Sequence, residues 1–271
     1  MRMKSVSHDE QRLGGRVCGV VVNAISWEGA LSTVVGLARA KTSASVAFCN
    51  VHVVTTAEEN ALLREALAKA DLCLPDGYPV AWFMRKLGYE NQPKISGPDF
   101  TLQICRRAAE ASISIYLYGS TQETLTKFAD SLRNSVPELV IAGMLSPPFR
   151  ELSAAEDQEI VSDIQNSGAG IVLVGLGCPK QEIWMASHKG RVPAVMLGVG
   201  AAFDFHAGTL KRAPEWMQSL ALEWLHRLWS EPNRLMARYL RTNSAFVLWV
   251  AKNWFRRAQL IRPVKSNRDS G

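Results

Sequence analysis

Apolar residues fall into short runs that alternate with longer stretches of helical periodicity almost as far as residue 200. The apolar runs predict seven strands, over Val17–Val22, Val46–Cys49, Leu72–Leu74, Ile113–Tyr118, Leu139–Met144, Ile171–Val174 and Ala194–Val199. The intervening windows predict helices over Trp27–Ala40, Ala57–Ala70, Pro98–Ala111, Thr121–Asn134, Ala154–Ser167 and Pro179–His188.

The apolar runs do not alternate with polar residues, which indicates strands that are covered on both faces. Regular alternation of strand and helix predicts a parallel sheet. We therefore expect an α/β fold with a Rossmann-like, mostly parallel sheet and helices on both of its faces.

The pattern changes after Gly208, where the strand signal stops and prolines divide a series of helical windows. We expect a flexible N-terminal tail over residues 1–15, an α/β catalytic domain over residues 16–208 and a helical appendage over residues 209–271. Because the last predicted strand ends at Val199, the α/β domain should fold without the appendage.

The composition of the appendage suggests a partner. Residues 205–271 hold 12 basic and four acidic residues, a net charge of +8, whereas the rest of the chain holds 19 basic and 21 acidic residues. The same segment contains five of the eight tryptophans. Tryptophan beside basic residues is typical of helices at a lipid headgroup boundary, so we expect an anionic membrane surface, and no nucleic acid, as a partner. The alternative is a solvated basic face whose aromatic residues pack on the core.

We expect the chain to lie on a membrane and not to cross it. The longest apolar run near the C-terminus, Ala245–Ala251, is far shorter than the roughly 20 residues that span a bilayer. The first 16 residues lack the apolar segment of a secretory signal, which predicts a cytoplasmic protein. Five scattered cysteines and five scattered histidines predict free thiols and no metal site.

Candidate binding residues follow several of the predicted strands. In an open α/β sheet the ligand binds outside the carboxyl ends of the strands. Asp76 leaves its strand beside a glycine, and glycine-containing turns at other strand ends suit contact with phosphate or ribose through backbone N–H groups. Taken alone, Asp76 fits an ordinary turn aspartate equally well. The candidates at this edge are Asn50, Asp76, Gly77, Gly119, Ser120, Gly175, Gly177, Lys180 and Gln181.

Motifs of other nucleotide-dependent enzymes are missing from the sequence. The first predicted strand is followed by Asn23–Trp27 (NAISW) and not by the GxGxxG turn of a dinucleotide-binding fold. The sequence contains neither a Walker loop nor a GxSxG nucleophile elbow. A nucleotide-type crevice with one prominent carboxylate and a basic appendage favours group transfer from a nucleotide-activated donor, without a bound cofactor.

Eight ordered segments carry a resemblance to a known family. They are Asn50–Ala57, Leu74–Gly77, Ile95–Phe100, Ser146–Phe149, Gly175–Glu182, Gly198–Gly208, Lys211–Pro214 and Glu223–Arg227. Together they resemble the WecG/TagA/CpsF glycosyltransferases (glycosyltransferase family 26). The resemblance implies an inverting, metal-independent hexosyltransferase that moves a sugar from a UDP-sugar onto a polyprenyl-diphosphate-linked saccharide at the cytoplasmic face of the membrane. It also implies a Rossmann-like fold whose C-terminal appendage completes the active site.

The resemblance implies roles for individual residues as well. Asp76 corresponds to the family's proposed general base, Asn50 to the polar residue beside it, and Gln181 to the glutamine of the PKQE loop. Three arginines of the appendage fall where the family is thought to bind the lipid diphosphate: Arg227, Arg234 and Arg238.

Two features bear on the substrates. Phe48 stands where several members carry a threonine, which predicts a different donor or acceptor pocket. The segment Ser146–Phe149 favours the branch that makes exopolysaccharide or enterobacterial common antigen, with a donor such as UDP-glucose, UDP-ManNAc or UDP-ManNAcA. The donor sugar, the acceptor sugar and formation of a homo-oligomer stay open.

Two other functions compete with glycosyl transfer. One is a peripheral membrane scaffold with a non-catalytic nucleotide crevice. The other is a soluble nucleotide-sugar epimerase or dehydrogenase, which the missing GxGxxG turn disfavours.

Overall fold

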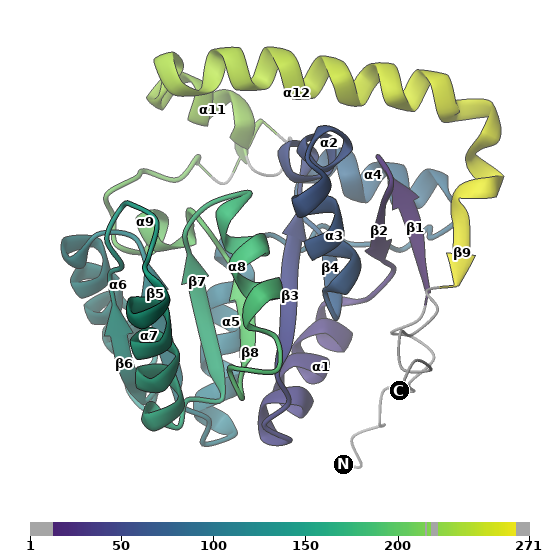
Figure 1. Ribbon diagram of the computed structural model, residues 1–271. Helices are drawn as coiled ribbons and strands as arrows, with labels where there is room; N and C mark the ends of the chain where they lie inside the picture. Colours follow the sequence, from purple (N-terminus) through teal and green to yellow (C-terminus); the bar gives the residue numbers. More distant parts are fainter. Residues whose placement is uncertain (1–12, 215, 218–221, 264–271) are drawn as a thin grey trace.

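A computed structural model of the protein describes residues 13–214, 216–217 and 222–263 (Figure 1). Residues 1–12 of the expected N-terminal tail lie outside the described residues. The last three residues assigned to that tail are not a tail, because they begin strand β1 (Leu13–Val17).

Six parallel strands form the central sheet, in the order β4-β3-β8-β7-β5-β6. The strands are β3 (Ala44–Cys49), β4 (Leu72–Pro75), β5 (Ile115–Gly119), β6 (Ile141–Leu145), β7 (Ile171–Gly175) and β8 (Val195–Gly198). Each coincides with a predicted apolar run, so the expected α/β class with a Rossmann-like parallel sheet is confirmed.

Helices cover both faces of this sheet (Figure 1). One face packs against α1 (Trp27–Arg39), α5 (Gly97–Glu110), α6 (Gln122–Ser135) and α9 (Ala202–His206). The other face packs against α2 (Val51–Glu59), α3 (Ala61–Lys69), α7 (Ala154–Ser167) and α8 (Lys180–His188).

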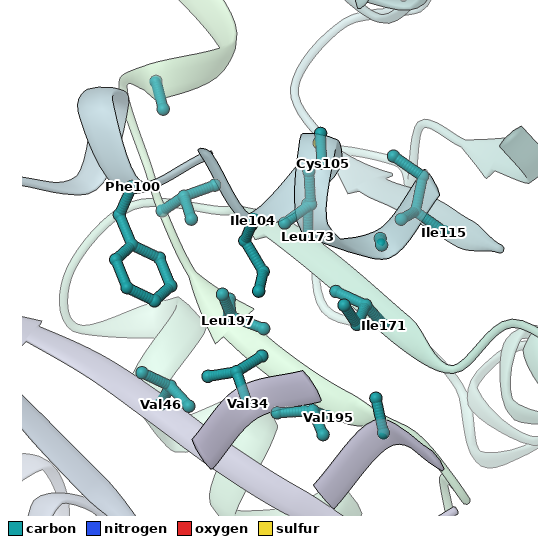
Figure 2. Close-up of a cluster of buried hydrophobic side chains, with 14 of the residues drawn as sticks. Val34, Val46, Phe100, Ile104, Cys105, Ile115, Ile171, Leu173, Val195 and Leu197 are labelled. Carbon is teal, nitrogen blue, oxygen red and sulfur yellow. The ribbon is translucent and has the colours of Figure 1, made fainter. Parts of the chain in front are cut away.

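Successive residues of a central strand point to opposite faces of the sheet. Val46 and Leu173 pack with Val34 and Ile104 between the sheet and the helices α1 and α5 (Figure 2). On the other face, the neighbouring strand residue Val172 packs beneath α7 and α8. Since both faces are apolar, the strands read as continuous apolar runs.

A second, smaller sheet has the order β2-β1-β9, and it corrects the first predicted strand. Val17–Val22 is not one strand of the parallel sheet. β1 and β2 (Val20–Asn23) form an antiparallel hairpin whose turn residues, Cys18 and Gly19, have φ angles of 46° and 77°. Two consecutive positive φ angles make a tight two-residue hairpin turn. Cysteine rarely adopts such a φ, so the apolar pattern concealed the turn.

The third strand of this sheet shows that the prediction of no strand after Gly208 is wrong. β9 (Ile261–Pro263) pairs antiparallel with β1. Phe246 is buried in the core beside α4 (Tyr78–Lys86), and Trp249 meets the Phe83 ring edge-on at 5.3 Å. The C-terminal segment therefore supplies part of a core that it shares with the N-terminal hairpin.

Two helical predictions also change. The predicted window Ala57–Ala70 is divided between α2 and α3, because Asn60 ends the first helix and caps the second by accepting a hydrogen bond from the Leu63 N–H at 3.0 Å. Helix α4 was not predicted, and it begins directly after Gly77.

The C-terminal segment lies over the edge of the central sheet where the strands end (Figure 1). It comprises α11 (Glu223–Ser230), α12 (Pro232–Asn253) and the 3₁₀ helix η2 (Trp254–Leu260), and α12 runs across α2. Among the helices that the structure describes, none combines the length and the apolar character needed to cross a bilayer.

Candidate functional site

The centre of the candidate site is a hydrogen-bonded pair of side chains at the ends of β3 and β4. The two strands are adjacent and parallel, with Cys49 opposite Pro75, so the residues that follow them, Asn50 and Asp76, leave the sheet side by side. The Asn50 side-chain Nδ2 donates a hydrogen bond to Asp76 Oδ2 at 3.2 Å. The structure thus brings together the expected base and its expected neighbour.

Helix α2 determines which way the Asn50 amide faces. Asn50 is the N-cap of α2, and its Oδ1 accepts a hydrogen bond from the Val53 N–H at 3.1 Å. An N-cap side chain must present an oxygen to the helix, so the amide nitrogen is left to face Asp76. The same Asn50 side chain therefore caps α2 and orients the Asp76 carboxylate.

Asp76 lies in an environment that favours its protonated form more than water does. Burial raises the pKa of Asp76 to about 6, against the lowering effect of the Asn50 hydrogen bond. Glu223 raises the pKa further, whereas Lys94 and Arg227 lower it. The side chain keeps partial access to solvent. A carboxylate with a pKa near 6 is ionised at neutral pH and basic enough to accept a proton from a bound hydroxyl.

Gly77 allows the chain to turn between Asp76 and α4. Its φ of 78° lies in the region that residues with a side chain rarely adopt. A Cβ there would be 3.9 Å from the Asn50 Cβ, which is ordinary contact, so the backbone conformation and not space requires glycine.

The next part of the edge, at the ends of β5 and β7, depends on close backbone approach. Gly119 is opposite Gly175, and a Cβ on Gly119 would lie 2.6 Å from the Gly175 carbonyl. The Ser120 N–H donates to the Gly175 carbonyl at 3.1 Å, and Ser146 Oγ donates to the Ser120 carbonyl at 2.7 Å. Gly119, Ser120 and Gly175 therefore hold the starts of the loops before α6 and α8 close together.

Gln181 braces the loop after β7. Its side chain is 5% exposed, and its Oε1 accepts from the Gly177 N–H at 3.1 Å. Its Nε2 donates to Glu182 Oε1 at 2.9 Å and to the Gly198 carbonyl at 2.8 Å. These bonds join the loop to the end of β8, while Lys180 at the start of α8 is exposed.

Arg227 reaches the site from α11. Its guanidinium carbon lies 5.4 Å from the centre of the Phe205 ring, and its charge lowers the pKa of Asp76. The buried Arg227 Nε has no hydrogen-bond partner among the residues that the structure describes. A guanidinium with a buried, unused donor is suited to an anionic ligand.

The other two arginines lie in α12. Arg238 lines a cavity of about 370 Å³ between α2 and α12, opposite His52. Burial, assisted by Arg238, lowers the pKa of His52 to about 4, so this imidazole is neutral near pH 7. Arg234 belongs to the same helix, but its side chain lies outside the described residues.

Phe48, the departure from the expected threonine, is buried. Its ring packs against Phe100 with the ring centres 5.5 Å apart, in the core beneath α5. Its effect on substrate choice stays a prediction.

Four charged residues near the site were missed by the sequence analysis: Lys94, Asp99, Arg212 and Glu223. They lie within or directly before the segments Ile95–Phe100, Lys211–Pro214 and Glu223–Arg227. Their opposite charges were visible in the sequence, but nothing in their spacing shows that they are in contact.

The sequence matches one family of known proteins over most of its length. The model of the family described as "Glycosyl transferase WecG/TagA/CpsF family" matches residues 15–260, a range that includes the whole central sheet, Asp76 and the arginines of α11 and α12. A match to a transferase family supports transfer chemistry over the epimerase or dehydrogenase alternative. Membership implies a nucleotide-sugar donor, a lipid-linked acceptor and a place in cell-surface polysaccharide synthesis. The chain belongs to the WecG/TagA/CpsF family of glycosyltransferases.

Proposed function

We propose that the protein is an inverting, UDP-sugar-dependent hexosyltransferase. The donor is of the UDP-glucose, UDP-ManNAc or UDP-ManNAcA type, and the acceptor is a polyprenyl-diphosphate-linked saccharide at the inner face of the cell membrane. The observation that carries the proposal is the pair Asn50–Asp76 at the carboxyl edge of the sheet, with the cationic Arg227 acting on it from α11.

The pair supports base catalysis of the attack on the donor. The acceptor hydroxyl loses its proton to Asp76 as its oxygen forms a bond to the anomeric carbon of the donor sugar. The bond from that carbon to the UDP oxygen breaks on the opposite side, which inverts the configuration. A base held within hydrogen-bond reach contributes a factor of roughly 10² to 10⁴ to the rate.

The departing UDP develops negative charge on its β-phosphate. The cationic Arg227, whose Nε is unused among the described residues, is suited to stabilise this charge. The Ser120 and Gly177 N–H groups are already bonded to Gly175 and Gln181, so they shape the loops instead. Among the described residues, no group of three His, Cys, Asp or Glu side chains is placed to hold a metal ion. We propose that Arg227 stabilises the departing UDP without a divalent cation, so turnover should persist in EDTA.

The outer face of α12 supports attachment to a membrane. Met236, Leu240 and Val247 are exposed and recur at helical spacing, so they form one apolar stripe. Leu235 and Phe246, roughly a third of a turn around the helix from the stripe, are buried. Exposed cations, Lys252 and Arg256 among them, follow the stripe along the chain, and Trp229 of α11 is also exposed. Apolar and basic residues together favour an anionic bilayer as the partner.

A reconstituted transfer assay tests this function. The full-length protein is incubated with a polyprenyl-diphosphate-linked saccharide in vesicles and with a panel of UDP-sugars, with and without EDTA, and the lipid product is analysed by mass spectrometry. Transfer of one sugar, with inverted anomeric configuration, is expected in both conditions. Binding to vesicles without turnover of any UDP-sugar would support the scaffold alternative instead.

A further inference from the structure

We propose that Glu223 is a positioning residue of the transferase site, where it joins Lys94 and Arg212 in an ionic latch that holds α11 against the α/β domain. The proposal rests on the proposed function and adds to it the device that places Arg227 beside Asp76. The latch consists of four residues: Lys94, Asp99, Arg212 and Glu223.

The anchor of the latch is a two-point ion pair. Arg212 Nη1 and Nη2 donate to Asp99 Oδ1 and Oδ2 at 2.6 and 2.8 Å. Ser96 Oγ also donates to Asp99 Oδ2. Parallel guanidinium–carboxylate bonds define both distance and orientation. Arg212, in the chain segment that leads towards α11, is thus firmly attached to the start of α5.

Glu223 connects this anchor to Lys94. Its Oε1 lies 3.6 Å from Arg212 Nε, and its Oε2 lies 3.7 Å from Lys94 Nζ. The Arg212 Nε is buried and makes no hydrogen bond among the described residues, so Glu223 supplies the charge that faces it. The side chains of Lys94, Arg212 and Glu223 are only 25–28% exposed, which reduces screening by water.

Glu223 and Arg227 belong to the same helix, so fixing one of them also fixes the position of the other. Glu223 is the first residue of α11, and Arg227 is one turn later, so the two side chains lie on the same face. Docking of Glu223 therefore places Arg227 against Phe205 and towards Asp76. If the latch opens, Arg227 loses its fixed position relative to the reacting atoms.

The latch also sets the charges that face Asp76. The charged groups that face Asp76 are Glu223 and Arg227 from α11 and Lys94 from the segment before α5. The thiol of Cys49 in β3 also faces it and is neutral. Glu223 raises the pKa of Asp76, and Lys94 lowers it. Through its own charge, loss of Glu223 should lower the pKa of Asp76 and loss of Lys94 should raise it, whereas release of Arg227 by either substitution should raise it.

The test compares two neutral variants, Glu223→Gln and Lys94→Gln. In Glu223→Gln the two effects on the Asp76 pKa oppose each other, and kcat near pH 7.5 should fall about three- to tenfold because Arg227 is no longer held in place. In Lys94→Gln the acid limb should move to higher pH. Glu65→Gln is the matched control, because it removes an exposed ion pair, with Lys69 on α3, and should leave the profile unchanged.

Direct titration of the Asp76 carboxyl by carbon NMR in the full-length protein separates this inference from the proposed function. Arg227→Gln should raise the pKa of Asp76 in the wild-type background and change it little in the Glu223→Gln background, even if no UDP-sugar is a substrate. An equal rise in both backgrounds, in folded variants, would overturn the latch. If Glu223→Gln does not fold, Glu223→Asp keeps the charge and Lys94→Gln alone must still raise the Asp76 pKa.

Discussion

Asn50 serves two neighbours with the two ends of one amide. Its oxygen caps α2 and its nitrogen holds Asp76, so the start of a helix orients the expected catalytic carboxylate. An amide held by its oxygen cannot rotate freely, which keeps the hydrogen-bond donor directed at Asp76 before any substrate binds.

Substitution of Asn50 should abolish both interactions at once. Asn50→Ala loses the cap of α2, worth about 1 kcal/mol, and it also loses the donor to the carboxylate. A hydrogen bond to a charged group is worth about 1.5–3 kcal/mol, so turnover should fall at least roughly tenfold. Loss of that bond should also raise the pKa of Asp76 and move the acid limb of the pH profile to higher pH.

Asn60→Ala is the matched control, because Asn60 caps α3 in the same way and has no contact with Asp76. The two variants should lose similar thermal stability, whereas only Asn50→Ala should lose activity. Equal activity in the two variants would show that the amide is only a helix cap.

The raised pKa of Asp76 predicts a stability effect with a definite sign. Because the pKa is about 6 in the folded protein and 3.8 ordinarily, the folded state holds the proton more tightly than the unfolded chain. The stabilisation that this provides is complete below the unfolded pKa and is lost as the pH rises through 6. Asp76→Asn carries no charge, so its melting temperature should exceed that of the wild type near pH 7.5 and approach it near pH 4. A difference that does not change with pH would contradict the assigned environment.

At the scale of elements, α12 separates two environments. One side packs on α2 and on the core of the small sheet, and the other presents the apolar stripe to solvent. A contiguous exposed apolar stripe marks an interaction surface, and with the neighbouring cations it favours the proposed anionic bilayer as the partner.

A single charge in the stripe should test this role. Leu240→Glu removes the burial of one leucine, worth about 1.5–3 kcal/mol, and adds repulsion from anionic lipid, so affinity for such vesicles should fall at least roughly tenfold. Leu62→Glu on α3 is the control, because both leucines are 64% exposed. Co-sedimentation with vesicles measures the difference, and equal binding by the two variants would exclude the stripe as the docking face.

The elements show which parts of the fold were visible in the sequence. The six parallel strands were predicted because burial on both faces leaves an uninterrupted apolar run, as in Ile171–Gly175. The hairpin at Cys18 was not predicted, because its turn has no Asn-Gly or Asp-Gly signal. The break between α2 and α3 was hidden for a related reason, since Asn60 ends one helix and caps the next without a proline or glycine.

At the scale of the whole molecule, the C-terminal segment is an integral part of the fold. Phe246 is 5% exposed in the core beside α4, whereas the adjacent Val247 is 64% exposed. Phe246→Ala should therefore cost about 3–5 kcal/mol of unfolding free energy, and Val247→Ala should cost less than about 0.5 kcal/mol. Denaturant unfolding measures both. Equal stability of the two variants would show that the segment packs only loosely.

Only part of the candidate site could be predicted from the sequence. Asn50 and Asp76 follow neighbouring parallel strands, so strand prediction places them at one edge, and the family resemblance points to Arg227. The contact between Asp99 and Arg212 joins residues 113 positions apart, and periodicity carries no information about such pairing. The latch could therefore be recognised only from the folded structure, not from the sequence.

The central claim is that Asp76 is the base of a glycosyl transfer, and one measurement tests it most directly. Turnover of UDP-sugar on the lipid-linked acceptor is compared for wild type and Asp76→Asn, with UDP affinity measured in parallel by calorimetry. The amide keeps the shape of the carboxyl but cannot accept the proton, so turnover should fall by at least roughly 10² while UDP affinity changes little. Near-normal turnover in Asp76→Asn would contradict the account.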